Sequence, residues 1–181
     1  MLLDPRLSLL LIVDVQERLV PAVQQTDQLI EACAWLVRLA RELKIPVRLS
    51  EQYPRGLGPT VSPLRDLLEP EQVLEKVHFS CVAEPNCREA IDETGREQII
   101  VAGIEAHVCV LQTVLNLLEQ GKQVFVVADA VSSRAPENAQ LGIERMRQAG
   151  AQIVTREMVF FEWLKKAGTE QFRALSKQYV R

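Results

Sequence analysis

The sequence predicts an α/β protein, a doubly wound three-layer sandwich around a parallel six-stranded sheet. Short runs rich in Val, Ile and Leu alternate along the chain with stretches that have the 3.6-residue periodicity of amphipathic helices. Several of these runs are almost continuously apolar, as expected for parallel strands that helices cover on both faces. Repeated strand–helix units of this kind imply right-handed crossovers within one sheet.

Six short runs are the expected strands: residues 7–13, 45–49, 73–76, 98–102, 123–128 and 152–154. The first run could also suggest a signal peptide. It leads to Asp14 rather than to a small-residue cleavage site, however, and a bilayer span needs about 20 apolar residues. A buried strand is therefore the simpler interpretation.

Four stretches have apolar residues at helical spacing: residues 29–43, 108–118, 136–150 and 169–179. Gly121 follows the second of them. The third begins near Pro136, a favoured early helical position, and stops at Gly150. Residues 50–63 have no periodicity and contain three prolines and two glycines. Because this segment follows a strand, we expect a loop near the carboxyl edge of the sheet, where such folds bind ligands.

Composition limits the class of protein. The 181 residues suffice for one compact domain, residues 1–181, and are few for two. A net charge of −3 without long single-sign runs argues against nucleic-acid and membrane partners. Four cysteines (Cys33, Cys81, Cys87 and Cys109) and only two histidines exclude the common zinc sites. We expect reduced thiols in the cytoplasm.

Three residues at strand ends carry groups that could do chemistry. Asp14 closes the first strand, where a carboxylate needs a cleft, a cation or a proton donor, although it could merely cap a turn. Lys76 ends the third strand, where lysines usually point into solvent. Cys109 follows the fourth strand at a predicted helix start, which would lower its pKa from about 8.5, but most free cysteines are simply buried apolar residues. A doubly wound sheet brings all three to one edge.

At these residues the chain resembles the isochorismatase-like cysteine hydrolase family. Three motifs match in the family's order: Leu-Ile-Val-Asp-Val-Gln at 11–16, Lys76 followed by Phe79-Ser80, and Ala-Gly-Ile-Glu-Ala-His-Val-Cys-Val at 102–110. Residues 126–134 also resemble the family's next strand and loop. The resemblance covers about residues 7–160.

The resemblance implies a catalytic triad. Asp14 would move the proton, Lys76 would stabilise the thiolate, and Cys109 would attack a carbonyl carbon. It also implies a cis peptide between Ile104 and Glu105, with the Glu105 and Cys109 backbone N–H groups forming an oxyanion hole. Four further side chains are expected to line the substrate pocket: Gln16, Tyr53, Phe79 and His107.

Departures from the family pattern narrow the expectation. Residues 49–60 lack the histidine of the nicotinamidase metal motif, so we expect no metal. They resemble instead a metal-free subgroup that includes YcaC-like and isochorismatase-domain-containing proteins. Cys109 argues against the vinyl-ether chemistry of true isochorismatases, which lack the cysteine. A nucleotide cofactor is disfavoured because no Gly-rich turn follows the first strand.

The expected function is hydrolysis of a small amide, urea-like or ester substrate without a cofactor, by a homo-oligomer. The late aromatic residues Phe160, Phe161 and Trp163 suit a core or a subunit interface. One alternative stays open: the chain could be a catalytically silent binding or scaffold protein of the same fold. A thiol redox protein is disfavoured, because it would want a resolving cysteine near Cys109, such as a Cys-x-x-Cys pair, and the sequence has none.

Overall fold

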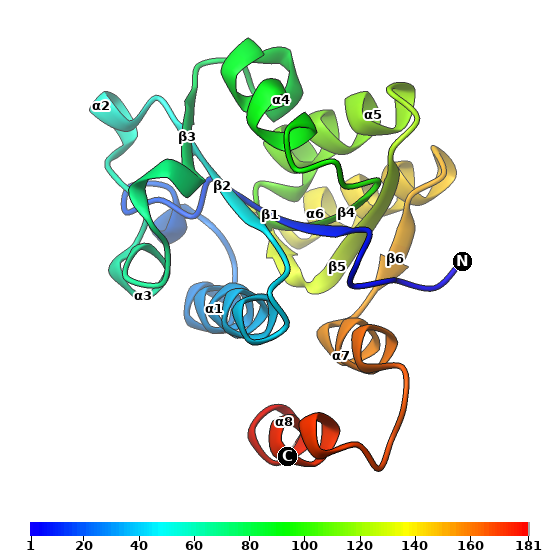
Figure 1. Cartoon of the computed structure of the whole chain (residues 1–181). Coiled ribbons are helices and arrows are strands. Elements are labelled where there is room, and N and C mark those ends of the chain that lie inside the picture. Colours follow the sequence, from blue (N-terminus) through cyan, green and yellow to red (C-terminus); the bar gives the residue numbers. More distant parts are fainter. Residues whose placement is uncertain (181) are drawn as a thin grey trace.

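A computed structural model describes residues 1–180 and confirms the parallel sheet with helices on both faces (Figure 1). The strand order is β3-β2-β1-β4-β5-β6, and all neighbours run parallel. The strands are β1 (Ser8–Val13), β2 (Val47–Gln52), β3 (Val73–Lys76), β4 (Gln98–Ile104), β5 (Gln123–Ser132) and β6 (Gln152–Val154).

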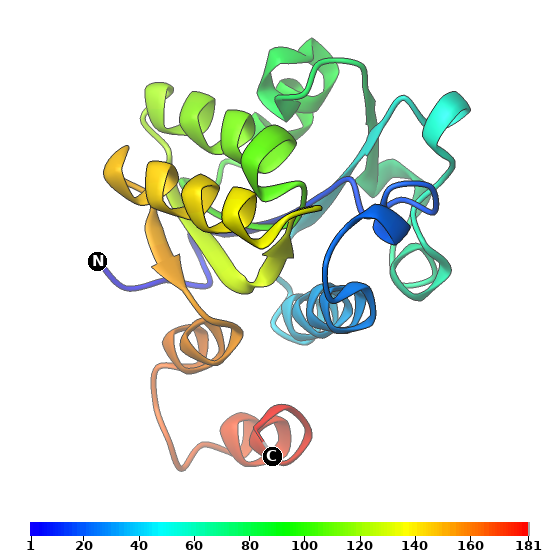
Figure 2. The same cartoon turned by 180° about the vertical axis from the view of Figure 1, so that it is seen from behind.

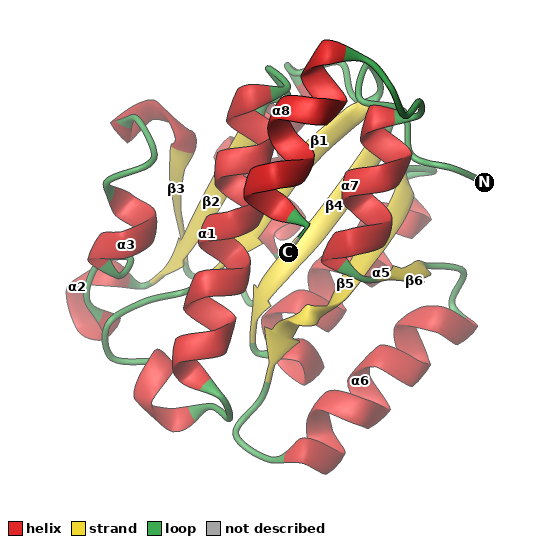
Figure 3. Ribbon diagram, turned by 90° about the horizontal axis from the view of Figure 1, so that it is seen from below, coloured by secondary structure: helices red, strands yellow, loops and turns green. Residues whose placement is uncertain are grey.

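Helices form the two outer layers. One face of the sheet carries α1 (Thr26–Glu42), α7 (Arg156–Leu164) and α8 (Glu170–Tyr179), which lie in front of the strands in Figure 3. The other face carries α4 (Pro85–Asp92), α5 (Leu111–Glu119) and α6 (Pro136–Gln148), as Figure 2 shows from behind. Short helices α2 (Pro54–Leu57) and α3 (Ser62–Arg65) lie beside the β3 edge. Within residues 1–180, no helix combines the length and apolarity needed to cross a bilayer.

Alternate side chains of β1 point to opposite faces of the sheet and so belong to two separate parts of the core. Leu10 and Ile12 pack into the α1/α7 side, whereas Leu9, Leu11 and Val13 pack into the α5/α6 side. All five side chains are fully buried. A strand covered on both faces is therefore a continuous apolar run, which is why the sequence pattern identified it.

The structure corrects several expected boundaries. β2 extends to Gln52, so the first three residues of the expected loop, 50–52, are buried strand residues. Helices α4 and α7 were not among the predicted helices. In α4 only Cys87 and Ile91 are buried, too few apolar positions for a clear periodicity.

The topology sets the place of the site. The strand order reverses between β1 and β4, since the chain proceeds outward from β1 on one side and from β4 on the other. Ligands in doubly wound sheets bind beyond the carboxyl ends of the strands at this switch point. Asp14 directly follows β1 there, and the loop after β4 contains Cys109.

Candidate active site

The three predicted residues come from three strand ends and meet at the switch point. Lys76 is the last residue of β3, two strands away from β1. Its Nζ lies 2.7 Å from Oδ2 of Asp14. The Asp14 carboxyl and the Cys109 thiol are near enough for each group to shift the pKa of the other. Asp14 is therefore the central member of the set.

The Asp14 side chain is fully buried and has a partner on each oxygen. The Ser50 hydroxyl donates to Oδ1 at 2.7 Å, and the Lys76 ammonium donates to Oδ2. The residue adopts a φ of 52°, and its backbone N–H donates to the Ser50 carbonyl. Two hydrogen bonds to β2 thus fix the carboxylate in one orientation.

The Lys76 ammonium is enclosed by acceptors. Besides Asp14, it donates to Gln52 Oε1 at 2.6 Å and to the carbonyls of Phe79 and His78 at 3.0 and 3.2 Å. A buried ammonium is costly unless its protons are all satisfied, and here one carboxylate and three neutral oxygens satisfy them. The chain turns back after β3 so that two of its own carbonyls face the lysine.

Burial and the ion pair shift the two pKa values. Burial raises the pKa of the Asp14 carboxyl above its usual 3.8, although Lys76, Ser50 and Cys109 oppose the shift. Burial is the largest single influence on the pKa of Lys76 and would lower it. The Asp14 carboxylate, together with the neighbouring Cys81 and Cys109, acts in the opposite direction, and the pKa lies above its usual value. Asp14 is therefore a stronger base than an exposed aspartate.

Cys109 lies in a π-helical turn, Ala106–Val110, that leads into α5. The side chain is buried, with 7% of the residue exposed. Here the expectation of a lowered pKa is wrong. Burial and the negative charge of Asp14 raise the pKa of the Cys109 thiol, and the opposing charge of Lys76 does not compensate. The raised pKa favours the protonated thiol at rest.

The peptide bond between Ile104 and Glu105 is cis. The Glu105 carboxylate points to Arg134, whose guanidinium and backbone N–H both donate to it. Burial raises the pKa of Glu105, but the hydrogen bonds from Arg134 outweigh it and the pKa lies below its usual value. The loop before the cysteine is thus tied to the loop after β5.

Gln16 does not belong among the pocket residues. Its side chain is fully buried, and both ends of its amide bind backbone. The amide nitrogen donates to the carbonyls of Gln52 and Gly58, and the oxygen accepts from the Gln52 N–H at 2.6 Å. Gln16 therefore joins the end of β1 to β2 and to the following loop, and it has no polar group left for a substrate.

The other expected pocket residues differ in exposure. Tyr53 and Phe79 are about half exposed and, with exposed Val77, surround the β3 end. Beside them a hollow of about 410 Å³ is lined in part by Tyr53, Arg55 and Val77. His107 is half-buried, and its two ring nitrogens face Ser133 and Asn138, so it contributes to the loop rather than to the hollow.

Sequence reasoning missed three residues of the site. Ser50 is hydrogen-bonded to Asp14, and Gln52 is hydrogen-bonded to Lys76. Their polar side chains in an otherwise buried strand could have indicated this role from the sequence. Cys81, in the turn after β3, is fully buried near the triad, where its thiol interacts with Ser50. Nothing in the sequence pattern distinguished Cys81 from the other cysteines.

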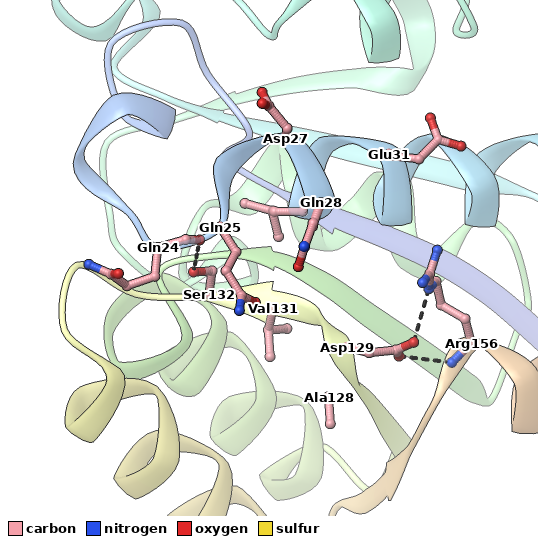
Figure 4. A pocket seen from close by; sticks show the side chains of 11 residues that line it. Gln24, Gln25, Asp27, Gln28, Glu31, Ala128, Asp129, Val131, Ser132 and Arg156 are labelled. Atoms are coloured by element: carbon pink, nitrogen blue, oxygen red, sulfur yellow. Dashed lines mark hydrogen bonds and ion pairs between the residues drawn. The ribbon is translucent and has the colours of Figure 1, made fainter.

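Other candidate sites are less developed. Among residues 1–180, no three His, Cys, Asp or Glu side chains converge as metal ligands would. A cavity of about 460 Å³ lies between α1 and β5 (Figure 4). Gln24 and Gln25 before α1, Gln28 within it, and the ion pair between Asp129 and Arg156 line it, and no triad residue does.

Comparison with known proteins agrees with the geometry. The model of the isochorismatase domain family matches residues 8–158. Isochorismatase domain-containing protein 2 of Pongo abelii is 39% identical over 96% of this chain and 83% of its own length. The structure of MAR1 ribonuclease from Caenorhabditis elegans has a TM-score of 0.92 and 35% identity, covering 100% of this chain and 93% of that one.

The YcaC gene product of Escherichia coli, described as an octameric hydrolase of unknown specificity, has a TM-score of 0.93 and 26% identity. The match covers 99% of this chain and 91% of the YcaC chain. The family model spans the strands that deliver Asp14, Lys76 and Cys109. This chain therefore belongs to the isochorismatase domain family and has its hydrolase fold.

Proposed function

We propose that this protein is a cysteine hydrolase that cleaves a small amide, urea-like or ester substrate through a thioester on Cys109. One observation carries the proposal: a buried carboxylate, Asp14, lies 2.7 Å from the Lys76 ammonium, and its charge acts on the neighbouring Cys109 thiol. A nucleophile, a base and a cation within one buried cluster are the parts that acyl transfer requires.

In the first half of the reaction, the Cys109 sulfur attacks the substrate carbonyl carbon while its proton passes to Asp14. The raised pKa of Asp14 favours this transfer. Lys76 keeps a positive charge beside the developing thiolate. Asp14 then gives the proton to the leaving nitrogen or oxygen as its bond to carbon breaks, and an acyl thioester remains.

In the second half, water attacks the thioester carbon and Asp14 takes the proton from that water. The C–S bond breaks, the acid leaves, and the proton returns to the sulfur. We assign the backbone N–H groups of Glu105 and Cys109 to the oxyanion in both halves, because Glu105 directly precedes the turn that presents the thiol and Cys109 belongs to it. The ammonium of Lys76 provides the only cation this scheme needs, so the proposal includes neither metal nor cofactor.

The surroundings favour a small substrate that has an apolar group, and the hollow beside the end of β3 also has charged residues, Arg55, Glu75 and Glu84, in its lining. Tyr53, Val77 and Phe79 expose apolar surface around the end of β3. The charges of Asp14 and Lys76 neutralise each other, so a neutral carbonyl compound would meet no net charge at the triad. We retain Tyr53 and Phe79 as proposed pocket walls.

One related structure suggests a different substrate, since the Caenorhabditis elegans protein is called a ribonuclease. An RNA substrate would favour a basic surface, whereas this chain has a net charge of −3. The remaining alternative is a catalytically silent scaffold, against which the complete Asp–Lys–Cys set argues. We also propose that the protein is a single-domain, cytoplasmic homo-oligomer; the octameric YcaC relative supports the oligomer.

The test is intact-mass trapping of an acyl adduct across a panel of small amides, ureas and esters. We expect at least one substrate to add its acyl mass to the wild-type protein and none to add it to Cys109→Ala. Cys33→Ala is the matched control, because Cys33 is a buried cysteine on α1, away from the triad. Absence of any adduct and of any turnover across the panel would favour the scaffold, and cleavage of a model RNA that Cys109→Ala abolishes would favour the ribonuclease.

A further inference from the structure

The loop that contains the nucleophile, residues 105–109, is held from outside by residues 133–142. The first contact is made by Arg134, just before α6. Its backbone N–H donates to Glu105 Oε2 at 2.9 Å, and its guanidinium donates to Oε2 at 3.1 Å and to Oε1 at 2.7 Å. One residue therefore fixes both carboxylate oxygens of Glu105.

The second contact is made around His107, two residues before the cysteine. Its Nδ1 lies 3.0 Å from the Ser133 hydroxyl, and its Nε2 lies 3.4 Å from the side-chain nitrogen of Asn138. Asn138 belongs to the first turn of α6. The imidazole is thus held between the loop after β5 and the helix that follows it.

The third contact is backbone against backbone. Gly142, one turn further along α6, is buried against the loop. A Cβ added there would lie 2.8 Å from the Ala106 carbonyl oxygen and 3.1 Å from the Cα of His107. Residues 138 and 142 are four apart and share one face of the helix. That face therefore packs directly on the turn preceding the thiol.

We propose that Arg134 is a positioning residue for Cys109, acting with Ser133, Asn138 and Gly142 as a brace that holds the cysteine loop in place. This inference rests on the proposed role of Cys109 as nucleophile. Arg134 itself touches no reacting atom in this scheme. It acts through Glu105, whose backbone belongs to the proposed oxyanion hole.

Energetics support a positioning role over a purely stabilising one. The Arg134 side chain is 62% exposed, and ion pairs with an exposed partner contribute little to stability. Misplacement of a reacting group by about 1 Å, in contrast, costs about 100-fold in rate. We therefore expect loss of the Arg134 guanidinium to affect the reactivity of Cys109 more than the melting temperature.

The experiment measures the rate at which iodoacetamide alkylates Cys109 between pH 6 and pH 10, resolved by peptide mass. In Arg134→Gln we expect the profile to move about one pH unit toward the 8.5 of free cysteine, with about tenfold faster labelling below the midpoint. Release of the loop would expose the thiol and separate it from Asp14, removing the causes of its raised pKa. The profile of Arg134→Lys should lie between those of the wild type and Arg134→Gln, because lysine keeps the positive charge but cannot form the bidentate contact with Glu105.

The matched control is Arg156→Gln. Arg156 binds Asp129 through its own N–H and Nε, at 2.9 and 3.0 Å, in the same manner as Arg134 binds Glu105, but beside the cavity of Figure 4. The pH profile of Cys109 alkylation in Arg156→Gln should match that of the wild type. Labelling of Cys33, which is fully buried, should stay slow in every variant and thereby exclude general loosening.

An unchanged Cys109 profile in Arg134→Gln and in Glu105→Gln would overturn the brace, as would absence of Cys109 labelling in all proteins. A change of the same size in Arg156→Gln would do so as well. None of these results depends on turnover. The proposed function would fail separately, if no substrate forms an adduct that Cys109→Ala abolishes.

Discussion

Replacement of Lys76 by methionine tests the ion pair at the centre of the site. Methionine keeps the length and apolar stem of lysine and removes the ammonium. The Asp14 carboxylate would then lose its charged partner inside the protein, and Gln52, His78 and Phe79 would each lose a donor.

The expected cost follows from burial. Both side chains of the pair are fully buried, and removal of one partner from such a pair costs about 3–5 kcal/mol. That is a large part of the about 5–15 kcal/mol by which proteins are stable. Lys122→Met is the matched control, because Lys122 pairs with a half-exposed Asp92 at 3.0 Å. We expect it to cost about 1 kcal/mol or less.

The cost should depend on pH. Without the ammonium, which lowers its pKa, the Asp14 carboxyl of the variant has a folded pKa further above the unfolded value of 3.8. A group whose pKa is raised on folding stabilises the protein at low pH, and this contribution is lost as pH rises through the folded pKa. The deficit of Lys76→Met should therefore be smaller at pH 5 than at pH 8.

The assay is urea unfolding at both pH values, with protein concentration held constant in case subunits associate. The reasoning is refuted if Lys76→Met lies within about 1 kcal/mol of the wild type at pH 8, or if its deficit is the same at pH 5. Either result would mean that water or a rearranged neighbour compensates Asp14 once the ammonium is removed.

Three further predictions concern the loop, the sheet and the polar core. In the wild type, alkylation of Cys109 should rise steeply only above about pH 8.5, because burial and Asp14 raise the pKa of the thiol, and a midpoint below about pH 8 would contradict this. Gly103→Ala should cost more than about 3 kcal/mol in a thermal melt, because its φ is +114° and a Cβ would lie 2.1 Å from the Val13 carbonyl oxygen. Gly121→Ala, with a φ of +80° and open space, should cost only about 1–2 kcal/mol, and equal costs would contradict the steric argument. Gln16→Leu should lower stability by at least about 2 kcal/mol and speed hydrogen exchange at the amide of Gln52, since it leaves buried backbone groups without partners; an unchanged exchange rate would argue that the loop rearranges.

The sheet could be predicted from the sequence because burial on both faces requires apolar residues at every strand position. Runs of this kind, such as β1 and β4, are continuously apolar after their first residues, Ser8 and Gln98, and no competing pattern confuses them. Polar residues inside a strand mislead the same rule. The sequence Ser50-Glu51-Gln52 has the composition of a loop, although these side chains are buried and hydrogen-bonded at the end of β2.

The site could be predicted as far as the topology determines it. Asp14, Lys76 and Cys109 all stand at strand ends, and a parallel sheet brings strand ends together whatever the loops do. The brace depends on side-chain contacts across 29 residues between Glu105 and Arg134, which no local pattern encodes. The same limit explains the error over Cys109: its helix position was visible, but the burial and the Asp14 charge that outweigh it come from packing.

A protonated thiol changes how the proposed reaction must begin. A preformed thiolate would need Lys76 for itself, yet Lys76 is already engaged with Asp14 and three other oxygens. The proton of Cys109 would therefore leave only as the carbon–sulfur bond forms, with Asp14 as its acceptor. Such a concerted transfer demands that thiol and carboxylate stay within hydrogen-bond reach when a substrate enters. The rigidity of the cysteine loop, and with it the brace around Arg134, then becomes a requirement of the chemistry rather than of the fold.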